Sequence, residues 1–124
     1  MDWKLSGNGP VYAQLAHALR LEIVAGGFAP GTRLPPVRTL AEQAQVNPNT
    51  MQRALAELER TGLVKSRRTA GRFVTEDEER LAQERRALAE ERSRAYLSEM
   101  DRLGYDRVRT VVLLERLREE TKEH

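Results

Sequence analysis

The sequence predicts a mainly α-helical protein with one small β-hairpin. Two observations lead to this prediction. Apolar residues recur at three- and four-residue steps through most of the 124 residues, which is the spacing of helices that bury one face. Between residues 63 and 75 the spacing changes, and apolar pairs flank a basic turn, as is typical of two short strands.

Length and composition limit the class of protein. A chain of 124 residues is one domain, or a small domain with a helical appendage, and this excludes a large multidomain enzyme. No apolar run approaches the roughly 20 residues that span a bilayer, and the N-terminus lacks the pattern of an export signal. We therefore expect a soluble, cytoplasmic protein with no membrane partner. The absence of cysteine excludes disulfides and thiolate metal sites.

Charge is divided unevenly along the chain. Residues 1–75 hold ten Lys and Arg against five Asp and Glu, a net charge of +5, whereas residues 76–124 hold eleven against fourteen, a net charge of −3. The basic part suggests a polyanionic partner, which would repel the acidic part. We therefore predict two domains, 1–75 and 76–124, with different tasks.

Three helices are expected in the first domain. The first begins at Pro10 and ends at Gly26-Gly27, because proline is tolerated in a first turn and glycine terminates helices. A short second helix follows the Pro35-Pro36 pair. The third begins at Pro48, since the Asn47 side chain can cap free helical N–H groups and proline suits the first helical position. The apolar residues of this third helix share one face, and its N-terminal end presents a polar front.

Together, a short helix, a tight turn, a helix with a polar front and a basic hairpin make a winged helix-turn-helix, with the helix-turn-helix at about 37–56 and the wing at about 63–75. The major groove of DNA admits one such helix, whose N-terminal residues reach the base edges. Asn49 and Gln52 suit bidentate contact with adenine, Arg53 suits guanine or phosphate, and Thr50 suits phosphate or local capping. The wing residues expected at the minor groove or the DNA backbone are Arg67, Arg68, Gly71 and Arg72.

Several spaced motifs follow one another in this domain. They are Pro10-Val-Tyr-x-Gln-Leu, Pro30-Gly-Thr-Arg-Leu-Pro-Pro-Val-Arg-x-Leu-Ala, Val46-Asn-Pro-Asn-Thr-Met-Gln-Arg-Ala, Leu55-x-x-Leu-x-x-x-Gly-Leu-Val and Arg67-Arg-x-x-Gly-Arg-Phe-Val. From about Pro10 to Val74 the chain thereby resembles the GntR family of bacterial transcriptional regulators.

The resemblance implies an N-terminal winged helix-turn-helix and a C-terminal dimerisation or effector domain. It also implies that Arg38 contacts DNA alongside residues 47–53 and the wing around Gly71; without the motif, Arg38 could equally form an ion pair with Glu42. Thr69 stands where many relatives have glycine, which predicts a longer or differently shaped wing turn.

Residues 76–124 are expected to form a long helix, a break at Gly104-Tyr105-Asp106 and a final helix. With its Leu103-Gly-Tyr at the break, this short tail resembles that of the YtrA subfamily, in which two helices mediate dimerisation and which often regulates transporter operons. The predicted dimerisation residues are Leu81, Leu88, Tyr96, Met100, Leu103, Val108, Val111, Val112 and Leu114.

We therefore expect a homodimeric repressor that binds a palindromic operator in double-stranded DNA, possessing half-sites roughly 34 Å apart. In an alternative hypothesis, the C-terminal helices are a protein–protein interaction module and DNA binding is incidental. No nucleophile with a base, metal set, cofactor loop or paired-carboxylate pocket can be assembled, so we predict no enzyme, metal or cofactor. The sequence leaves open whether a small-molecule effector exists; the residues after Thr75 are too few for a pocket within one subunit.

Overall fold

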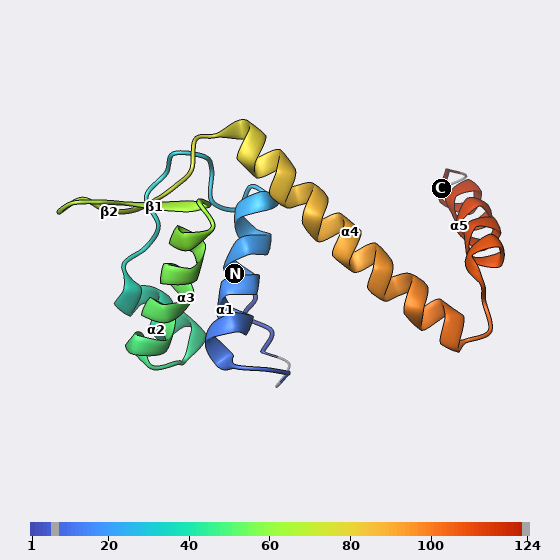
Figure 1. Cartoon of the computed structure of the whole chain (residues 1–124), viewed down its shortest axis with the longest axis horizontal. Coiled ribbons are helices and arrows are strands. Elements are labelled where there is room, and N and C mark those ends of the chain that lie inside the picture. Colours follow the sequence, from blue (N-terminus) through green and yellow to red (C-terminus); the bar gives the residue numbers. More distant parts are fainter. Residues whose placement is uncertain (6–7, 123–124) are drawn as a thin grey trace. The chain divides into compact units, whose positions relative to one another are not determined.

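The computed structural model describes residues 1–5 and 8–122 and is mainly helical with one β-hairpin, which confirms the predicted fold class (Figure 1). The elements, in order, are α1 (Val11–Val24), α2 (Val37–Ala44), α3 (Pro48–Arg60), β1 (Val64–Arg67), β2 (Gly71–Val74), α4 (Glu78–Arg102) and α5 (Arg107–Lys122).

The chain divides into two compact units, one up to Arg85 and one from Arg86 onward. The first unit thus includes the first two turns of α4, beyond the position after Thr75 where the charge changes sign. The reason is Leu81, which is 4% exposed and belongs to the hydrophobic core of the first unit. We had expected Leu81 in a dimer interface, and its burial within one subunit corrects that expectation.

Packing of α1 against α3 builds the core of the first unit, and α2 packs on α3 beside it (Figure 1). Leucine side chains dominate this core because they sit on the helix faces that the apolar spacing marked. Trp3, from the N-terminal segment, packs against it as a partly buried side chain. The fully buried large side chains on the three helices are Leu15, Leu19, Leu40, Met51 and Leu55.

The turn between α2 and α3 follows local rules that the sequence displays. Gln45 ends α2 in a left-handed conformation, with φ of 57°. Asn47 then accepts a hydrogen bond from the Asn49 backbone N–H at 2.7 Å, so it caps α3 as predicted, and Pro48 occupies the first position of that helix. α3 runs to Arg60 and ends just before Gly62, a residue that favours helix termination.

The hairpin is antiparallel and joins Arg67 to Gly71 through a three-residue turn, which the Ala70 N–H closes by donating to the Arg67 carbonyl at 3.0 Å. Thr69 adopts a left-handed backbone there, with φ of 65°. The segment before α2 pairs with the free edge of β2, which we did not predict from the sequence. In it, the Val74 N–H donates to Thr32 and the Leu34 N–H donates to Arg72, each at 2.9 Å.

Charged groups hold the first turns of α4 to the rest of the first unit. Glu84 is 8% exposed and accepts hydrogen bonds from Arg20 and Arg80. Arg80 also donates to the Thr61 carbonyl at 3.0 Å, and Arg85 donates to the Val24 carbonyl at 3.1 Å. These bonds fix the start of α4 to α1 and to the end of α3.

The second unit consists of the rest of α4 and of α5, joined at the break that Gly104 makes with φ of 88°. Asp106 caps α5 by accepting from the Arg109 N–H at 2.9 Å. Among the described residues, no helix is both long enough and apolar enough to cross a membrane.

We expect Leu81→Ala to lower the free energy of unfolding by about 2–5 kcal/mol, because it leaves a cavity in the core of the first unit. Denaturant unfolding at one fixed protein concentration measures this. Leu5→Ala is the matched control, since Leu5 is 40% exposed, and it should change stability by no more than about 0.5 kcal/mol. Equal stability of the two variants would contradict the core position of Leu81.

Glu84→Gln should destabilise the protein at pH 7 by about 2 kcal/mol, the typical contribution of hydrogen bonds to a charged group. Burial raises the pKa of the Glu84 carboxyl, but the hydrogen bonds from Arg80 and Arg20 outweigh burial and hold this pKa below its ordinary value of 4.5. A carboxyl whose pKa is lower in the folded state stabilises the fold at pH values above its unfolded-state pKa. This stabilisation is lost as the pH falls through its folded-state pKa.

The stability difference between wild type and Glu84→Gln should therefore narrow as the pH is taken below about 4.5. Urea unfolding across this range measures the difference. Glu42→Gln is the control, because Glu42 is exposed and forms no ion pair with another described residue. A difference that stayed constant with pH would show that the ionised Glu84 carboxylate does not stabilise the fold.

Candidate nucleic-acid interface

The N-terminal end of α3 presents the polar front that the sequence predicted. Asn49 and Gln52 are exposed, and Thr50 is half-buried. The core holds the opposite face of the helix, through Met51 and Leu55. Because backbone N–H groups and the positive end of the helix dipole also lie at this end, it favours anionic partners.

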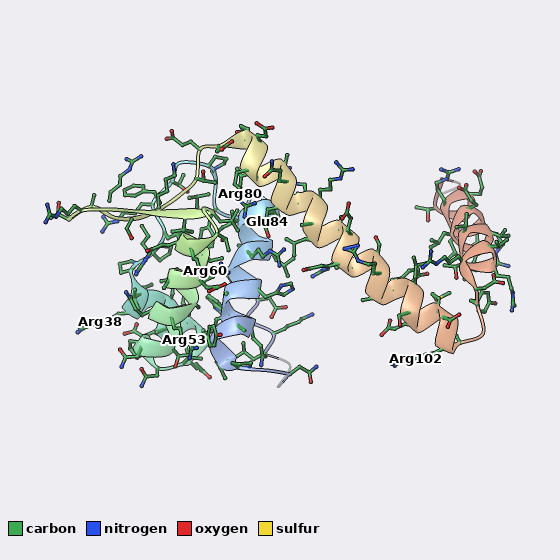
Figure 2. All side chains as sticks on the ribbon, viewed as in Figure 1. Arg38, Arg53, Arg60, Arg80, Glu84 and Arg102 are labelled. Atoms are coloured by element: carbon green, nitrogen blue, oxygen red, sulfur yellow. The ribbon has the colours of Figure 1, made fainter. Side chains whose placement is uncertain are left out.

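Arg53 is held by an aromatic side chain that our sequence prediction did not include. The Arg53 Cζ lies 3.8 Å from the centroid of the Tyr12 ring, which α1 contributes. Stacking occupies one face of the guanidinium and leaves its N–H edge free to donate in the plane. Tyr12 belongs to the Pro-Val-Tyr-x-Gln-Leu motif, which is the only signal in the sequence for this role. Figure 2 shows Arg53 with Arg38 at the end of the first unit where α2 and the start of α3 lie.

Arg38 lies in the first turn of α2 and is exposed. It forms no ion pair with Glu42, nor with any other side chain in the described part of the chain. Its guanidinium therefore stays available to an external anion, which is the role that the family motif implies.

The two faces of the wing differ in charge. Val64 and Val74 are buried on the inner face, which also carries Arg72. The Arg72 guanidinium, with 19% of the side chain exposed, forms an ion pair with Glu59 of α3. We had expected Arg72 to meet DNA, but its charge is directed inward and neutralised.

Glu59 is the acceptor that organises this inner face. It also accepts a hydrogen bond from the Ser66 hydroxyl at 2.6 Å. Burial raises the pKa of Glu59, but the hydrogen bonds from Ser66 and Arg72 outweigh burial and hold the pKa below its ordinary value. Ionised Glu59 thus fastens both strands of the wing to α3.

The outer face and the tip carry the remaining cations of the wing. Arg67 stacks on Phe73, with the Arg67 Cζ 4.5 Å from the ring centroid. Arg68 lies in the turn and is exposed. Gly71 has φ of 101°, a conformation that favours glycine. The structure therefore brings the predicted residues of α2, α3 and the wing together in one unit. Among these predicted DNA-binding residues, Arg72 is the one that forms an ion pair with a carboxylate.

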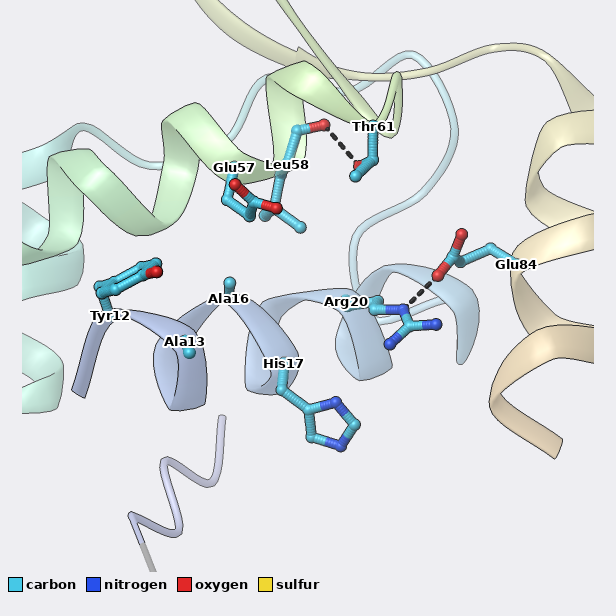
Figure 3. A pocket seen from close by; sticks show the side chains of 9 residues that line it. All are labelled: Tyr12, Ala13, Ala16, His17, Arg20, Glu57, Leu58, Thr61 and Glu84. Atoms are coloured by element: carbon cyan, nitrogen blue, oxygen red, sulfur yellow. Dashed lines mark hydrogen bonds and ion pairs between the residues drawn. The ribbon is translucent and has the colours of Figure 1, made fainter. Parts of the chain in front are cut away.

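A groove of about 430 Å³ lies beside α1 and α3, on the Tyr12 side (Figure 3). Its two carboxylates are already engaged, Glu84 with Arg20 and Arg80, and Glu57 with Arg60. Its remaining lining residues include Ala13, Ala16, His17, Leu58 and Thr61.

Comparison with known proteins identifies the family. The model for bacterial regulatory proteins of the gntR family matches residues 11–74. The chain belongs to the GntR family. Over 104 residues it is 36% identical to the uncharacterised regulator YhcF of Bacillus subtilis, a match that covers 84% of this GntR chain and 86% of YhcF. It is 37% identical to the transcriptional repressor YtrA of the same organism over 68 residues, about half of each chain (55% and 52%).

Solved structures agree with this assignment. A GntR-family regulator from Listeria monocytogenes superposes with a TM-score of 0.81 at 35% identity and covers 90% of this chain and 98% of its own. The DNA-binding domain of AraR in complex with its operator ORX1 gives a TM-score of 0.53 at 29% identity over 60% of this chain and 92% of its own. This YtrA-like GntR protein is thus a DNA-binding transcriptional regulator with a winged helix-turn-helix, and it is not an enzyme.

Arg38→Ala should weaken binding to a duplex that carries the promoter of the protein's own operon. Each lost phosphate contact should flatten the plot of log affinity against log salt by about 0.9. Fluorescence anisotropy at several salt concentrations measures the slope. Arg60→Ala is the matched control, because Arg60 lies at the opposite end of α3 in an ion pair with Glu57. Equal slopes for wild type and Arg38→Ala would remove Arg38 from the interface.

Proposed function

We propose that this GntR regulator is a homodimeric repressor that binds a palindromic operator. The observation that supports dimerisation is the apolar surface of α5. Val108 is 73% exposed, Val112 64% and Val111 54%. Leu114 and Leu117 are exposed on the same helix, at 44% and 42%. Fully burying each such side chain stabilises an interface by about 1.5–3 kcal/mol, so a helix with five of them favours a partner.

The apolar surface is shaped as well as exposed. A groove of about 280 Å³ lies on α5 between side chains that include Val108, Val112 and Leu113. Arg109 borders the groove, stacks on Tyr105 at 4.3 Å and donates to the Gly104 carbonyl at 2.8 Å, so this border is held in place. A groove beside exposed valines can accept the same valines from a second copy, which is the self-complementarity that a two-fold interface needs.

Burial narrows the set of residues that we propose for the dimer. Leu81 belongs to the first unit, and Leu88 and Met100 are already buried within one subunit, at 3% and 8% exposure. We therefore assign the dimer surface to the exposed members of the set. These are Tyr96, Leu103, Val108, Val111, Val112 and Leu114, together with Leu117.

The proposed dimer accounts for an operator with two-fold symmetry. Two copies related by a two-fold axis present two identical α3 helices, and successive major grooves on one side of DNA lie roughly 34 Å apart. The YtrA name supports the repressor assignment, since YtrA is a transcriptional repressor and is 37% identical over the matched residues. We extend the proposal to a transporter operon as the target, as the subfamily resemblance implies.

A second candidate function uses the same surface. The exposed apolar side chains of α5 would also suit a different protein, in which case the C-terminal helices serve as an interaction module. Sedimentation of the purified full-length chain separates the two hypotheses, because a homodimer forms without any other protein.

Val112→Asp should convert the dimer into a monomer, because burying an unpaired carboxylate in an apolar interface is costly. Analytical ultracentrifugation measures the mass, and circular dichroism checks that the helices persist. We expect the variant to bind a palindromic duplex no more tightly than a single half-site, whereas wild type prefers the palindrome. Ser98→Asp adds the same charge at an exposed position of α4 and should remain dimeric. A dimeric Val112→Asp would refute the assigned surface.

A further inference from the structure

An arginine that none of the predicted contacts includes lies against the wing. Arg33 precedes α2 in the chain, and its backbone forms an antiparallel bridge with Phe73 of β2. β2 is therefore paired on both edges, with β1 on one side and the segment around Arg33 on the other. The wing is in effect a three-stranded structure at its base.

Alternation along the strands places Arg33 on the outer face of the wing. On β2, Val74 is buried and Arg72 binds Glu59 of α3, so residues 72 and 74 face inward and Phe73 faces outward. Arg33 lies directly opposite Phe73 and shares its face. Its neighbour Leu34 is 3% exposed, as expected for the inward side.

The Arg33 side chain extends along this outer face to Gly71, at the start of β2. A Cβ added at Gly71 would lie 2.9 Å from the Arg33 Nε and 3.4 Å from its Nη2. The guanidinium thus occupies the space that the missing side chain leaves open. Gly71 is paired with Arg67 next to the turn, so Arg33 delivers its charge toward the tip of the wing.

Arg33 and Arg72 differ in how their charges are used. Arg72 is neutralised by Glu59. Arg33 is exposed and forms no ion pair or hydrogen bond through its side chain within residues 1–5 and 8–122. On the same outer face lie Lys65, also opposite Phe73, and Arg67. Three cations therefore surround Phe73, and arginine presents a planar set of donors that matches phosphate oxygens.

We propose that Arg33 contacts the phosphate backbone of DNA beside the wing, in place of Arg72, with its guanidinium lying over Gly71. This inference rests on the proposed interface of α2, α3 and the wing. Gly71 then has two functions, a left-handed backbone at the end of the turn and an open surface for the Arg33 guanidinium.

The test measures the salt dependence of binding of the full-length protein to duplex DNA. Arg33→Ala should flatten the log–log slope by about 0.9 for each subunit bound, as expected for one lost phosphate contact. Arg33→Lys keeps the charge and should retain the wild-type slope. Arg72→Gln is the matched control from the same hairpin and should leave the slope unchanged, because the charge of Arg72 is already neutralised by Glu59 and glutamine keeps an N–H donor for that carboxylate.

Gly71→Ala tests this position of the guanidinium without removing a charge. It should flatten the slope by no more than Arg33→Ala does, because the flexible guanidinium can shift, and adding it to Arg33→Ala should flatten the slope no further, because the contact is already lost. Circular dichroism and thermal unfolding identify any variant that does not fold. If Gly71→Ala does not fold, the comparison of the Arg33 and Arg72 variants still tests the proposal.

Arg38→Ala distinguishes failure of this inference from failure of the interface on which it rests. A wild-type slope for Arg33→Ala together with a flattened slope for Arg38→Ala would overturn the role of Arg33 and leave the interface intact. Wild-type slopes for both would overturn both. A flattened slope for Arg72→Gln and not for Arg33→Ala would return the contact to Arg72.

Discussion

The packing of α3 is the constraint on which the rest of the first unit depends. α1, α2 and β1 all contact this one helix, so its buried face, centred on Met51 and Leu55, positions these three elements. A helix of 13 residues that buries one side along its length can offer DNA only its remaining side and its N-terminal end. At the N-terminal end Asn49 and Gln52 stay exposed, because the helix begins at the Asn47 cap directly after the tight turn.

Carboxylates decide which of the many arginines can meet an external anion. Glu59 neutralises Arg72 on the inner face of the wing, and Glu84 engages Arg20 and Arg80 where α4 joins the first unit. The Glu59–Arg72 and Glu84–Arg20 pairs join different elements of the first unit. Within the described part of the chain, the arginines that form no ion pair with a carboxylate include Arg38, in the first turn of α2, and Arg33, on the outer face of the wing. The net positive charge of the first domain therefore says less about binding than the distribution of its acids.

The candidate site could be predicted from the sequence wherever local chemistry determines geometry. Asn47 and Pro48 mark the start of α3, and the polar residues after them lie on its exposed end as expected. Predictions based on residue type alone were less successful at Arg72 and Leu81, since nothing local indicates that Arg72 faces Glu59 or that Leu81 joins the first core. The Tyr12 ring beneath Arg53 is a contact between residues distant in the chain, which periodicity does not reveal.

The sequence by itself determined the element order, the ends of the helices, the hairpin and the family, because caps, proline, glycine and apolar spacing act over a few residues. Only the tertiary structure decided which side chains of those elements remain free. The pairing of the Arg33 segment with β2, the inward turn of Arg72 and the docking of the first two turns of α4 each join residues far apart in the chain. Such contacts depend on the shape and charge of two surfaces that meet only in the folded protein. A local sequence pattern describes a single element, and for this reason it does not reveal them.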